Sequence, residues 1–236
     1  MTHHRERPTA ISIIRKSTLF GGIPDSDMDL LAQWGQTHQF VRGETIWLDG
    51  TAASFICVIG TGFVKMVKST GTGHEITHEI MGPGQTFGFL GAIDGTGCPL
   101  IARAVTDCWV IKIPKTSIMP IYERTVALKD HVIRRTTIRL RKAHELVARL
   151  STGNVESRII SILLMLAESY GEEKTGGEIE LNVPLTRQDI AEMAGTTVES
   201  TIRVMSKWKK DGLVTSSAKL ITIHDVDLLS ARVAPI

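Results

Sequence analysis

A glycine-free stretch in the middle of the chain, residues 117–150, constrains the fold more than any other feature. It contains a seam of positions spaced alternately three and four apart, apolar except for one lysine and one threonine, as on the face of a long helix that packs against another helix. We therefore expect a dimerisation helix, with packing against the rest of the chain as the alternative. The seam positions are Val126, Lys129, Ile133, Thr136, Leu140, Ala143, Val147 and Leu150, and all but the first two form the predicted dimer interface.

The segments on either side of this helix differ in residue composition and hydrophobic pattern. Residues 40–114 consist of short runs rich in β-branched residues, with glycine-containing turns about every ten residues, which is typical of an antiparallel sandwich or barrel. Short helices are expected over residues 12–35, broken at Gly21–Pro24. After a hinge at residues 151–154 we expect, in order, a helix at 155–168, a strand at 178–183, two closely spaced helices, and a hairpin formed by 213–217 and 220–223.

Residues 185–214 carry the pattern of a helix-turn-helix. Thr186 lies three residues before Asp189, which predicts an N-cap with an acidic residue in the first helical turn. Gly195 supplies the tight turn, and Thr196 or Thr197 caps the second helix. Ile202, Met205 and Trp208 are predicted to form the inner face of that helix. The predicted DNA-contacting residues are Thr186, Arg187, Thr197, Val198, Glu199, Thr201, Ile202, Arg203 and Lys207.

Two of these residues are suited to reading bases. Glu199 and Arg203 are four positions apart, so both project from one face of a helix. An arginine can bind guanine O6 and N7, and a carboxylate can accept from cytosine N4. Lys207 and Lys209 are candidates for phosphate contacts. The alternative for Glu199 is a capping box with Thr196, which would be structural.

Charge and hydropathy agree with a nucleic-acid partner and no membrane partner. The net charge is only +2, but residues 123–149 contain eight Lys or Arg against three Asp or Glu. This excess suits a phosphate backbone, although a solvated helix face would look similar. No run of 18 apolar residues occurs, and the first residues lack the apolar core of a secretion signal, so we expect a cytoplasmic protein.

Together with this pattern, motifs along nearly the whole chain resemble those of the cyclic-AMP receptor protein/FNR (Crp/Fnr) family of bacterial regulators. The motifs are Gly43-Glu44, Gly60-x-Gly62-x-Val64-Lys65, Gly82-Pro83-Gly84-x-x-Phe87-Gly88 and Val155-Glu156-Ser157-Arg158-Ile159, besides the long helix and the helix-turn-helix.

The resemblance implies an α+β fold in three parts. Residues 1–116 would form an antiparallel, cyclic-nucleotide-binding-like β-roll sensor domain with short N-terminal helices, 117–152 the dimerisation helix and hinge, and 153–236 a winged helix-turn-helix. It also implies a homodimer that binds a palindromic site in double-stranded DNA and contacts RNA polymerase. In the family, residues matching Glu199 and Arg203 read a G·C pair in a shared T-G-A core. The family's arginine and serine are absent at Val198 and Ile202, so the flanking bases are not predicted.

The resemblance breaks down where cyclic-AMP-responsive members hold their ligand. Phe89 stands in place of a glutamate, and Cys98-Pro99 in place of an Arg-Ser pair that binds phosphate. Cysteine and proline offer no charge-assisted donors, so we expect no dependence on cyclic AMP. The remaining segment is either packed shut or a pocket for an unidentified small effector. The candidate pocket residues are Phe89, Leu90, Cys98, Pro99, Leu100, Arg103 and His144.

Metal and cofactor chemistry finds no support in the sequence. No cysteine precedes Cys57, so the N-terminal iron–sulfur cluster of oxygen-sensing members is not expected; Cys57 and Cys108 are predicted to be core residues. The segment His74–His78 matches H-E-x-x-H, but its glycine and β-branched context predicts a strand. Histidines four apart on a strand are about 13 Å from each other and cannot share one zinc ion.

Two rival functions are weighed against transcription regulation. A metal-dependent barrel enzyme built on residues 40–115 would need clustered His and Glu ligands. A cyclic-nucleotide module that acts on a protein partner would have no use for a helix-turn-helix with a wing. We expect a regulator that is not an enzyme and that carries no metal or cofactor.

Overall fold

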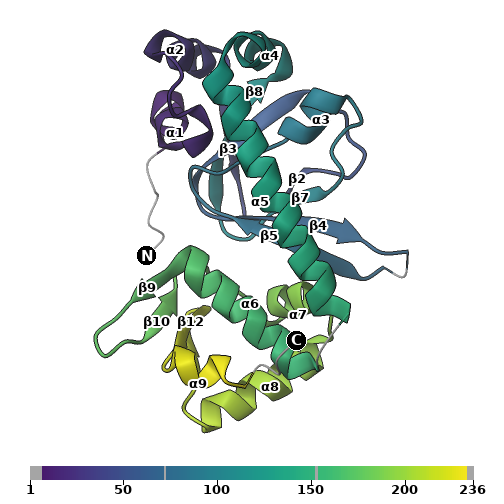
Figure 1. Cartoon of the computed structure of the whole chain (residues 1–236), viewed down its shortest axis with the longest axis vertical. Coiled ribbons are helices and arrows are strands. Elements are labelled where there is room, and N and C mark those ends of the chain that lie inside the picture. The colour runs from purple at the N-terminus through teal and green to yellow at the C-terminus, as the bar shows by residue number, and fades with distance from the viewer. Residues whose placement is uncertain (1–6, 72, 152–153, 233–236) are drawn as a thin grey trace. The chain divides into compact units, whose positions relative to one another are not determined.

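The computed structural model describes residues 7–71, 73–151 and 154–232, apart from the side chains of 149–151 (Figure 1). The chain forms two compact units, Met1–Lys68 with Glu79–Arg141, and Ser69–His78 with Lys142–Ile236. The division falls inside the helix α5 (Val126–Ser151). Within the described part of the chain, no helix is long and apolar enough to span a membrane.

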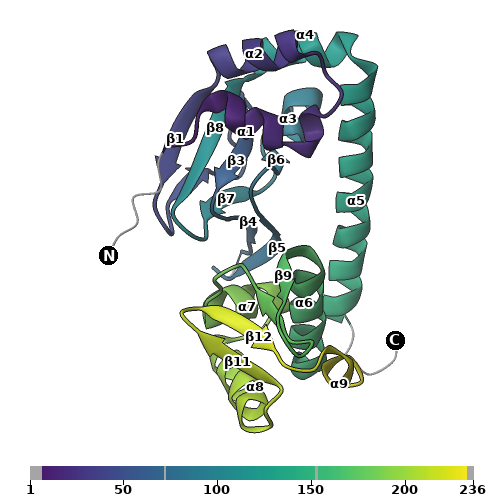
Figure 2. The same ribbon diagram turned by 90° about the vertical axis from the view of Figure 1, so that its left-hand side faces the viewer.

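The strands of the first half of the chain form two four-stranded sheets, as the β-branched runs and glycine turns of residues 40–114 predict (Figure 2). One sheet has the order β1-β8-β3-β6 and the other the order β2-β7-β4-β5. The strand pairs for which a register is known are antiparallel. The strands are β1 (Gln36–Phe40), β2 (Thr45–Trp47), β3 (Phe55–Thr61), β4 (Val64–Ser69), β5 (Glu75–Met81), β6 (Thr86–Phe87), β7 (Ile101–Ala104) and β8 (Cys108–Pro114).

Alternation along β3 shows how this unit builds two cores. Cys57 and Ile59 point into a core between the two sheets, whereas Ile56 and Val58 point to the opposite face of the strand, where helices cover the sheet. All four side chains are fully buried, because successive strand residues face opposite sides and both sides are covered. The covering helices are α1 (Ala10–Lys16), the 3-10 helix η1 (Thr18–Phe20), α2 (Asp25–Trp34), α3 (Phe89–Asp94), α4 (Lys115–Arg124) and the start of α5.

The glycine-free stretch forms two helices where the sequence predicts one. Thr125 is extended (φ −107°, ψ 108°) and ends α4, and α5 starts at Val126. Apolar periodicity gives no sign of this break, because buried residues keep helical spacing on both sides of it. The local signal is the adjacent β-branched pair Thr125-Val126, which lowers helix propensity only slightly. The short helix α3, held between the left-handed residues Gly88 and Gly95, also goes beyond the sequence prediction.

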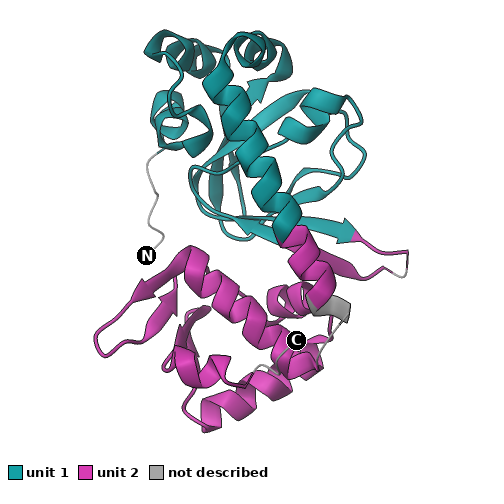
Figure 3. Ribbon diagram, in the orientation of Figure 1, with its two compact units in different colours: residues 1–68, 79–141 teal, residues 69–78, 142–236 magenta. Residues whose placement is uncertain are grey.

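The second unit contains the predicted succession of helix, strand, two helices and hairpin (Figure 3, magenta). Its four-stranded sheet has the order β11-β12-β10-β9, so the predicted hairpin is extended by two more strands. Of the predicted hinge, residues 152–153 lie outside the described residues. The elements are α6 (Val155–Tyr170), β9 (Gly171–Glu173), β10 (Ile179–Leu181), α7 (Arg187–Ala194), α8 (Val198–Lys210), β11 (Val214–Ser217), β12 (Leu220–Ile223) and α9 (Val226–Ser230).

Candidate nucleic-acid interface

The first helix of the helix-turn-helix, α7, begins with a reciprocal cap. The Thr186 hydroxyl accepts a hydrogen bond from the Asp189 backbone N–H (3.1 Å), and the Asp189 carboxylate accepts from the Thr186 N–H (2.9 Å). Gly195 then adopts the left-handed conformation (φ 56°, ψ 47°) that a side chain would disfavour. The predicted cap and turn are both confirmed, and together they fix where α8 starts.

The second helix, α8, buries one face and exposes the other. Thr197 is its N-cap and accepts from the Ser200 N–H at 3.2 Å, so the alternative capping box from Thr196 does not form. The buried face consists of Thr201, Met205 and Trp208.

The assignment of Ile202 to this inner face is wrong, since its side chain is 48% exposed. Thr201 takes the inner position instead, and it is fully buried with its hydroxyl donating to the Thr197 carbonyl oxygen (3.1 Å). A threonine can be buried in this way because the helix backbone satisfies its hydroxyl. Its side chain therefore does not lie on the exposed face where DNA contacts were predicted.

Glu199, Ile202, Arg203 and Lys207 lie on the exposed face of α8, and Val198 is half-buried. The pKa of Glu199 is held below its ordinary value, first by its own backbone N–H and then by the Thr197 hydroxyl. Glu199 is therefore a carboxylate at neutral pH and can act only as a hydrogen-bond acceptor. The exposed face combines this acceptor with the five-donor guanidinium of Arg203 one turn away.

The wing, which is the hairpin of β11 and β12, is hydrogen-bonded to the start of α7. The Arg187 guanidinium donates to the Ser216 hydroxyl on β11 (3.0 Å), and the Leu185 N–H donates to the Lys219 carbonyl oxygen (2.9 Å). Between β11 and β12, Ala218 (φ 49°) and Lys219 (φ 69°) both adopt left-handed conformations. This is the backbone of a tight hairpin turn in which glycine and asparagine are the usual residues.

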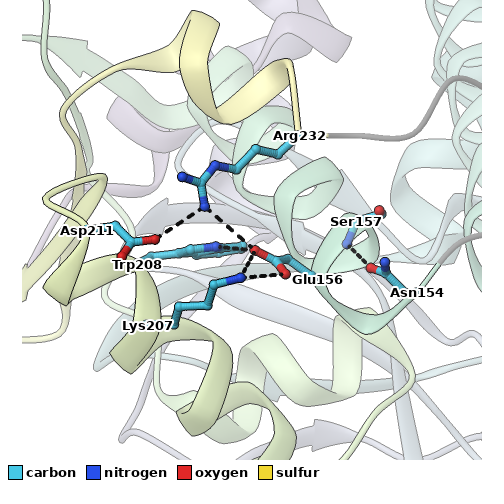
Figure 4. A network of polar contacts seen from close by, with 7 residues as sticks. All are labelled: Asn154, Glu156, Ser157, Lys207, Trp208, Asp211 and Arg232. Carbon is cyan, nitrogen blue, oxygen red and sulfur yellow. Dashed lines mark hydrogen bonds and ion pairs between the residues drawn. The ribbon is translucent and has the colours of Figure 1, made fainter.

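The far end of α8 is held by a carboxylate from α6 (Figure 4). Glu156 accepts a hydrogen bond from Trp208 Nε1 (2.8 Å), and Lys207 Nζ lies 3.4 and 3.3 Å from its two oxygens. Arg232 Nη1 lies 4.0 Å from Glu156 and 3.3 Å from Asp211. The Trp208 N–H, followed by the Lys207 ammonium, keeps the pKa of Glu156 below its ordinary value.

Sequence reasoning missed Glu156 as a site residue. It is separated from Trp208 by 52 positions, and neither its place in the first turn of a helix nor its place in the Val155–Ile159 motif indicates that contact.

The residues predicted for dimerisation form an exposed stripe on α5. The exposed fractions are 62% for Ile133, 57% for Leu140 and 64% for Val147, and Thr136 and Ala143 are exposed as well. The side chain of Leu150 lies outside the described residues. Three apolar residues spaced by seven positions are thus solvent-exposed in the single chain.

The residues of the candidate effector pocket differ in burial and in the core that they join. Phe89 packs in the helix-covered core, with its ring 5.8 Å from that of Tyr122, while Leu100 packs against the core between the sheets. Leu90, Pro99 and His144 are exposed, Arg103 is half-buried, and Cys98 is buried. This arrangement favours the alternative in which the segment is packed.

The cysteines are free and buried, and the prediction that Cys57 and Cys108 are core residues is confirmed. Burial raises the pKa of all three thiols, to about 12 for Cys108. They are therefore protonated and poorly nucleophilic at neutral pH.

The H-E-x-x-H segment has the predicted strand conformation, because Glu75–Met81 forms β5. No cluster of three potential metal ligands occurs in the part of the chain that the structure describes.

Comparisons with known proteins place both halves of the chain. Residues 37–125 match the cyclic nucleotide-binding domain, and residues 157–232 match the Crp-like helix-turn-helix domain. A CRP-like cAMP-activated global transcriptional regulator of Mycobacterium tuberculosis is 24% identical over 220 residues, which cover 93% of this chain and 98% of that one.

Solved structures show the same fold. FixK2 from Bradyrhizobium japonicum has a TM-score of 0.76 at 22% identity, with 86% of this chain and 98% of that chain covered. A protein from Ruegeria pomeroyi DSS-3 is 28% identical, with a TM-score of 0.58 and 99% of both chains covered.

Proposed function

This chain belongs to the Crp/Fnr family of transcription regulators, and from that membership we propose that it binds a palindromic DNA site as a homodimer and reads bases through α8. The observation that carries the proposal is the exposed face of α8. Glu199 and Arg203 are solvent-exposed on that face, whereas the opposite face is locked into the domain core by Met205 and Trp208. A helix anchored on one side and polar on the other is the arrangement that enters a major groove.

The proposed contacts divide into two kinds. Arg203 reads guanine and Glu199 reads cytosine in a T-G-A core, while Val198 and Ile202 lie against the neighbouring bases. Thr186, Arg187 and Thr197 contact the phosphate backbone near the start of each helix, where backbone N–H groups favour anions. Thr201 is left out of this set because it is buried.

The remaining parts of the chain take the roles that the sequence predicts. We assign residues 1–116 to a sensor domain, 117–152 to dimerisation and hinge, and 153–236 to DNA binding, with RNA polymerase as the partner through which transcription changes. The Mycobacterium tuberculosis relative is cAMP-activated, but here Phe89 is buried in a core and Pro99 offers no donor. We therefore assign DNA binding that does not depend on cyclic AMP.

The test is selection of genomic fragments by the purified protein, with and without cyclic AMP. We expect the same palindromic fragments in both cases, with half-sites whose centres are about one helical turn apart. Fragments recovered only with cyclic AMP would contradict the proposed independence from cyclic AMP. Failure to select any sequence would contradict DNA recognition and would favour a module that acts on a protein partner.

Arg203→Ala then tests the reading residue on the selected site. Removing a forked contact to guanine should cost about 1–3 kcal/mol and relax the preference at one base pair. Exposed Lys209→Ala is the comparison, because loss of a phosphate contact weakens all sequences alike. Equal weakening of selected and random DNA by Arg203→Ala would show that Arg203 is a backbone contact.

A further inference from the structure

We propose that Glu156 is a positioning residue that limits sequence-independent DNA binding: it holds Lys207 in an intramolecular network and so keeps this cation from a phosphate contact. The inference rests on the proposed DNA binding by α8, and it reassigns Lys207, which the sequence predicts to contact DNA. Glu156 would thereby change the affinity for DNA from α6, without itself touching a base.

Lys207 is placed where a phosphate contact would be expected. It lies four residues after Arg203, so it continues the exposed face of α8 by one turn. Its side chain is 57% exposed, yet its ammonium lies within 3.4 Å of both Glu156 carboxylate oxygens. To contact DNA, Lys207 must first leave a partner that is already in place.

That partner is fixed independently of Lys207. Trp208 is fully buried, and a buried indole N–H without an acceptor is unfavourable because its lost hydrogen bond to water is not replaced. Glu156 supplies the acceptor at 2.8 Å. The carboxylate therefore cannot follow Lys207 toward the solvent without leaving the Trp208 N–H unsatisfied.

The charges of the network cancel. Lys207 and Arg232 contribute two positive charges, and Glu156 and Asp211 contribute two negative charges, all joined by ion pairs of 3.3–4.0 Å. A single exposed ion pair is worth little, but here the Glu156 carboxylate is also held in position by the Trp208 N–H. Lys207 and Arg232 are thus neutralised within this network, whereas Lys209 and Lys210 in the last turn of α8 are exposed.

Holding Lys207 away from phosphates affects binding to DNA of any sequence. Each cation that neutralises a phosphate makes the slope of log binding constant against log salt concentration more negative by about 0.9. It strengthens binding to specific and random DNA alike. Withholding Lys207 therefore lowers the affinity for selected and random DNA alike and flattens the salt dependence of both, while Glu199 and Arg203 set the difference between the two affinities.

Glu156→Gln tests this inference because glutamine keeps the size and an acceptor oxygen for Trp208 but removes the charge. We expect binding to random duplex DNA to tighten several-fold at about 0.1 M salt, with a slope steeper by roughly 0.9. The matched control is Glu168→Gln, which makes the same charge change at an exposed residue near the other end of α6 and should leave the slope unchanged.

Lys207→Ala supplies the second measurement. In the native background it should leave the slope unchanged, and in the Glu156→Gln background it should restore the native slope. A native slope flattened by about 0.9 in Lys207→Ala would overturn the inference, because Lys207 would then already contact a phosphate. Equal slopes for Glu156→Gln and Glu168→Gln would overturn it as well.

Failure of the Glu156 proposal can be distinguished from failure of the proposed DNA recognition by α8. If Glu156→Gln does not fold, Lys207→Ala alone decides, since Lys207 is exposed and can be truncated without opening a core. Native protein that selects no DNA sequence would contradict the proposed function before any variant is compared.

Discussion

Single side chains decide which face of α8 is available and how firmly it is held. Thr201 is buried where the sequence predicts Ile202, because its hydroxyl bonds to the helix backbone and the apolar residue is left on the exposed side. Trp208 is buried because Glu156, from another helix, accepts its N–H. Both residues are buried through a side-chain hydrogen bond, which hydrophobic periodicity cannot predict.

Glu156 also gives the domain a defined pH dependence. Its pKa in the folded protein is below the ordinary value of 4.5, so its stabilising contribution is present above the unfolded pKa and is lost as pH falls through the folded pKa. We expect Glu156→Gln to lower the free energy of unfolding by about 1 kcal/mol near pH 7, since a charge-assisted bond becomes a neutral one. Urea unfolding of both proteins between pH 7 and pH 3 measures this.

The difference between the two proteins should shrink as the pH falls below about 4.5, because Glu156 of the unfolded chain then takes up a proton, and it should vanish below the lower pKa of the folded protein. Exposed Glu173→Gln is the control and should unfold like the native protein throughout. A difference between Glu156→Gln and the native protein that is constant with pH would mean that size or geometry, and not charge, causes the loss.

Among the elements, those defined by local signals agree with the sequence prediction, and those defined by distant contacts do not. The strands of residues 40–114, the cap at Thr186 and the turn at Gly195 are encoded by alternation, capping chemistry and glycine. The break at Thr125 has only a weak local signal. The network around Glu156 requires the fold, since it joins α6 to residues about 50 positions away.

The wing turn is an element whose sequence does not match its geometry. Ala218 has φ 49°, a conformation that costs a residue with a Cβ about 1–2 kcal/mol. Glycine adopts this conformation without that cost, but part of the gain is offset because glycine loses more entropy on folding. We therefore expect Ala218→Gly to raise the free energy of unfolding by about 0.5–1 kcal/mol, as measured by urea denaturation.

Ala231→Gly is the matched control, since Ala231 lies in the right-handed helical region (φ −61°) at the end of α9. There the same substitution should lower stability. Equal effects of the two substitutions would show that the wing turn stores no backbone strain.

For the whole molecule, the exposed stripe on α5 is the feature that a single chain leaves unexplained. Leu140→Asp would place a charge in the proposed helix–helix seam, at a cost of several kcal/mol to association. We expect this variant to sediment as a folded monomer, because Leu140 is exposed within one chain and its replacement opens no core. Analytical ultracentrifugation with circular dichroism measures both properties.

Ile138→Asp is the control for the stripe. Ile138 is exposed to a similar extent, 52%, but it lies five positions from Ile133 and so on another face of the helix. This variant should remain a dimer. Dimers for both variants would show that the stripe is not the interface.

A stripe that is covered only by a second copy makes regulation depend on how much protein the cell contains. At levels where single chains predominate, the dimer concentration follows the square of the chain concentration, so halving synthesis leaves about a quarter of the dimers. Occupancy of a weak site would then respond to gene dosage more steeply than in proportion. Changes in synthesis or degradation of the chain could therefore switch such promoters without any ligand.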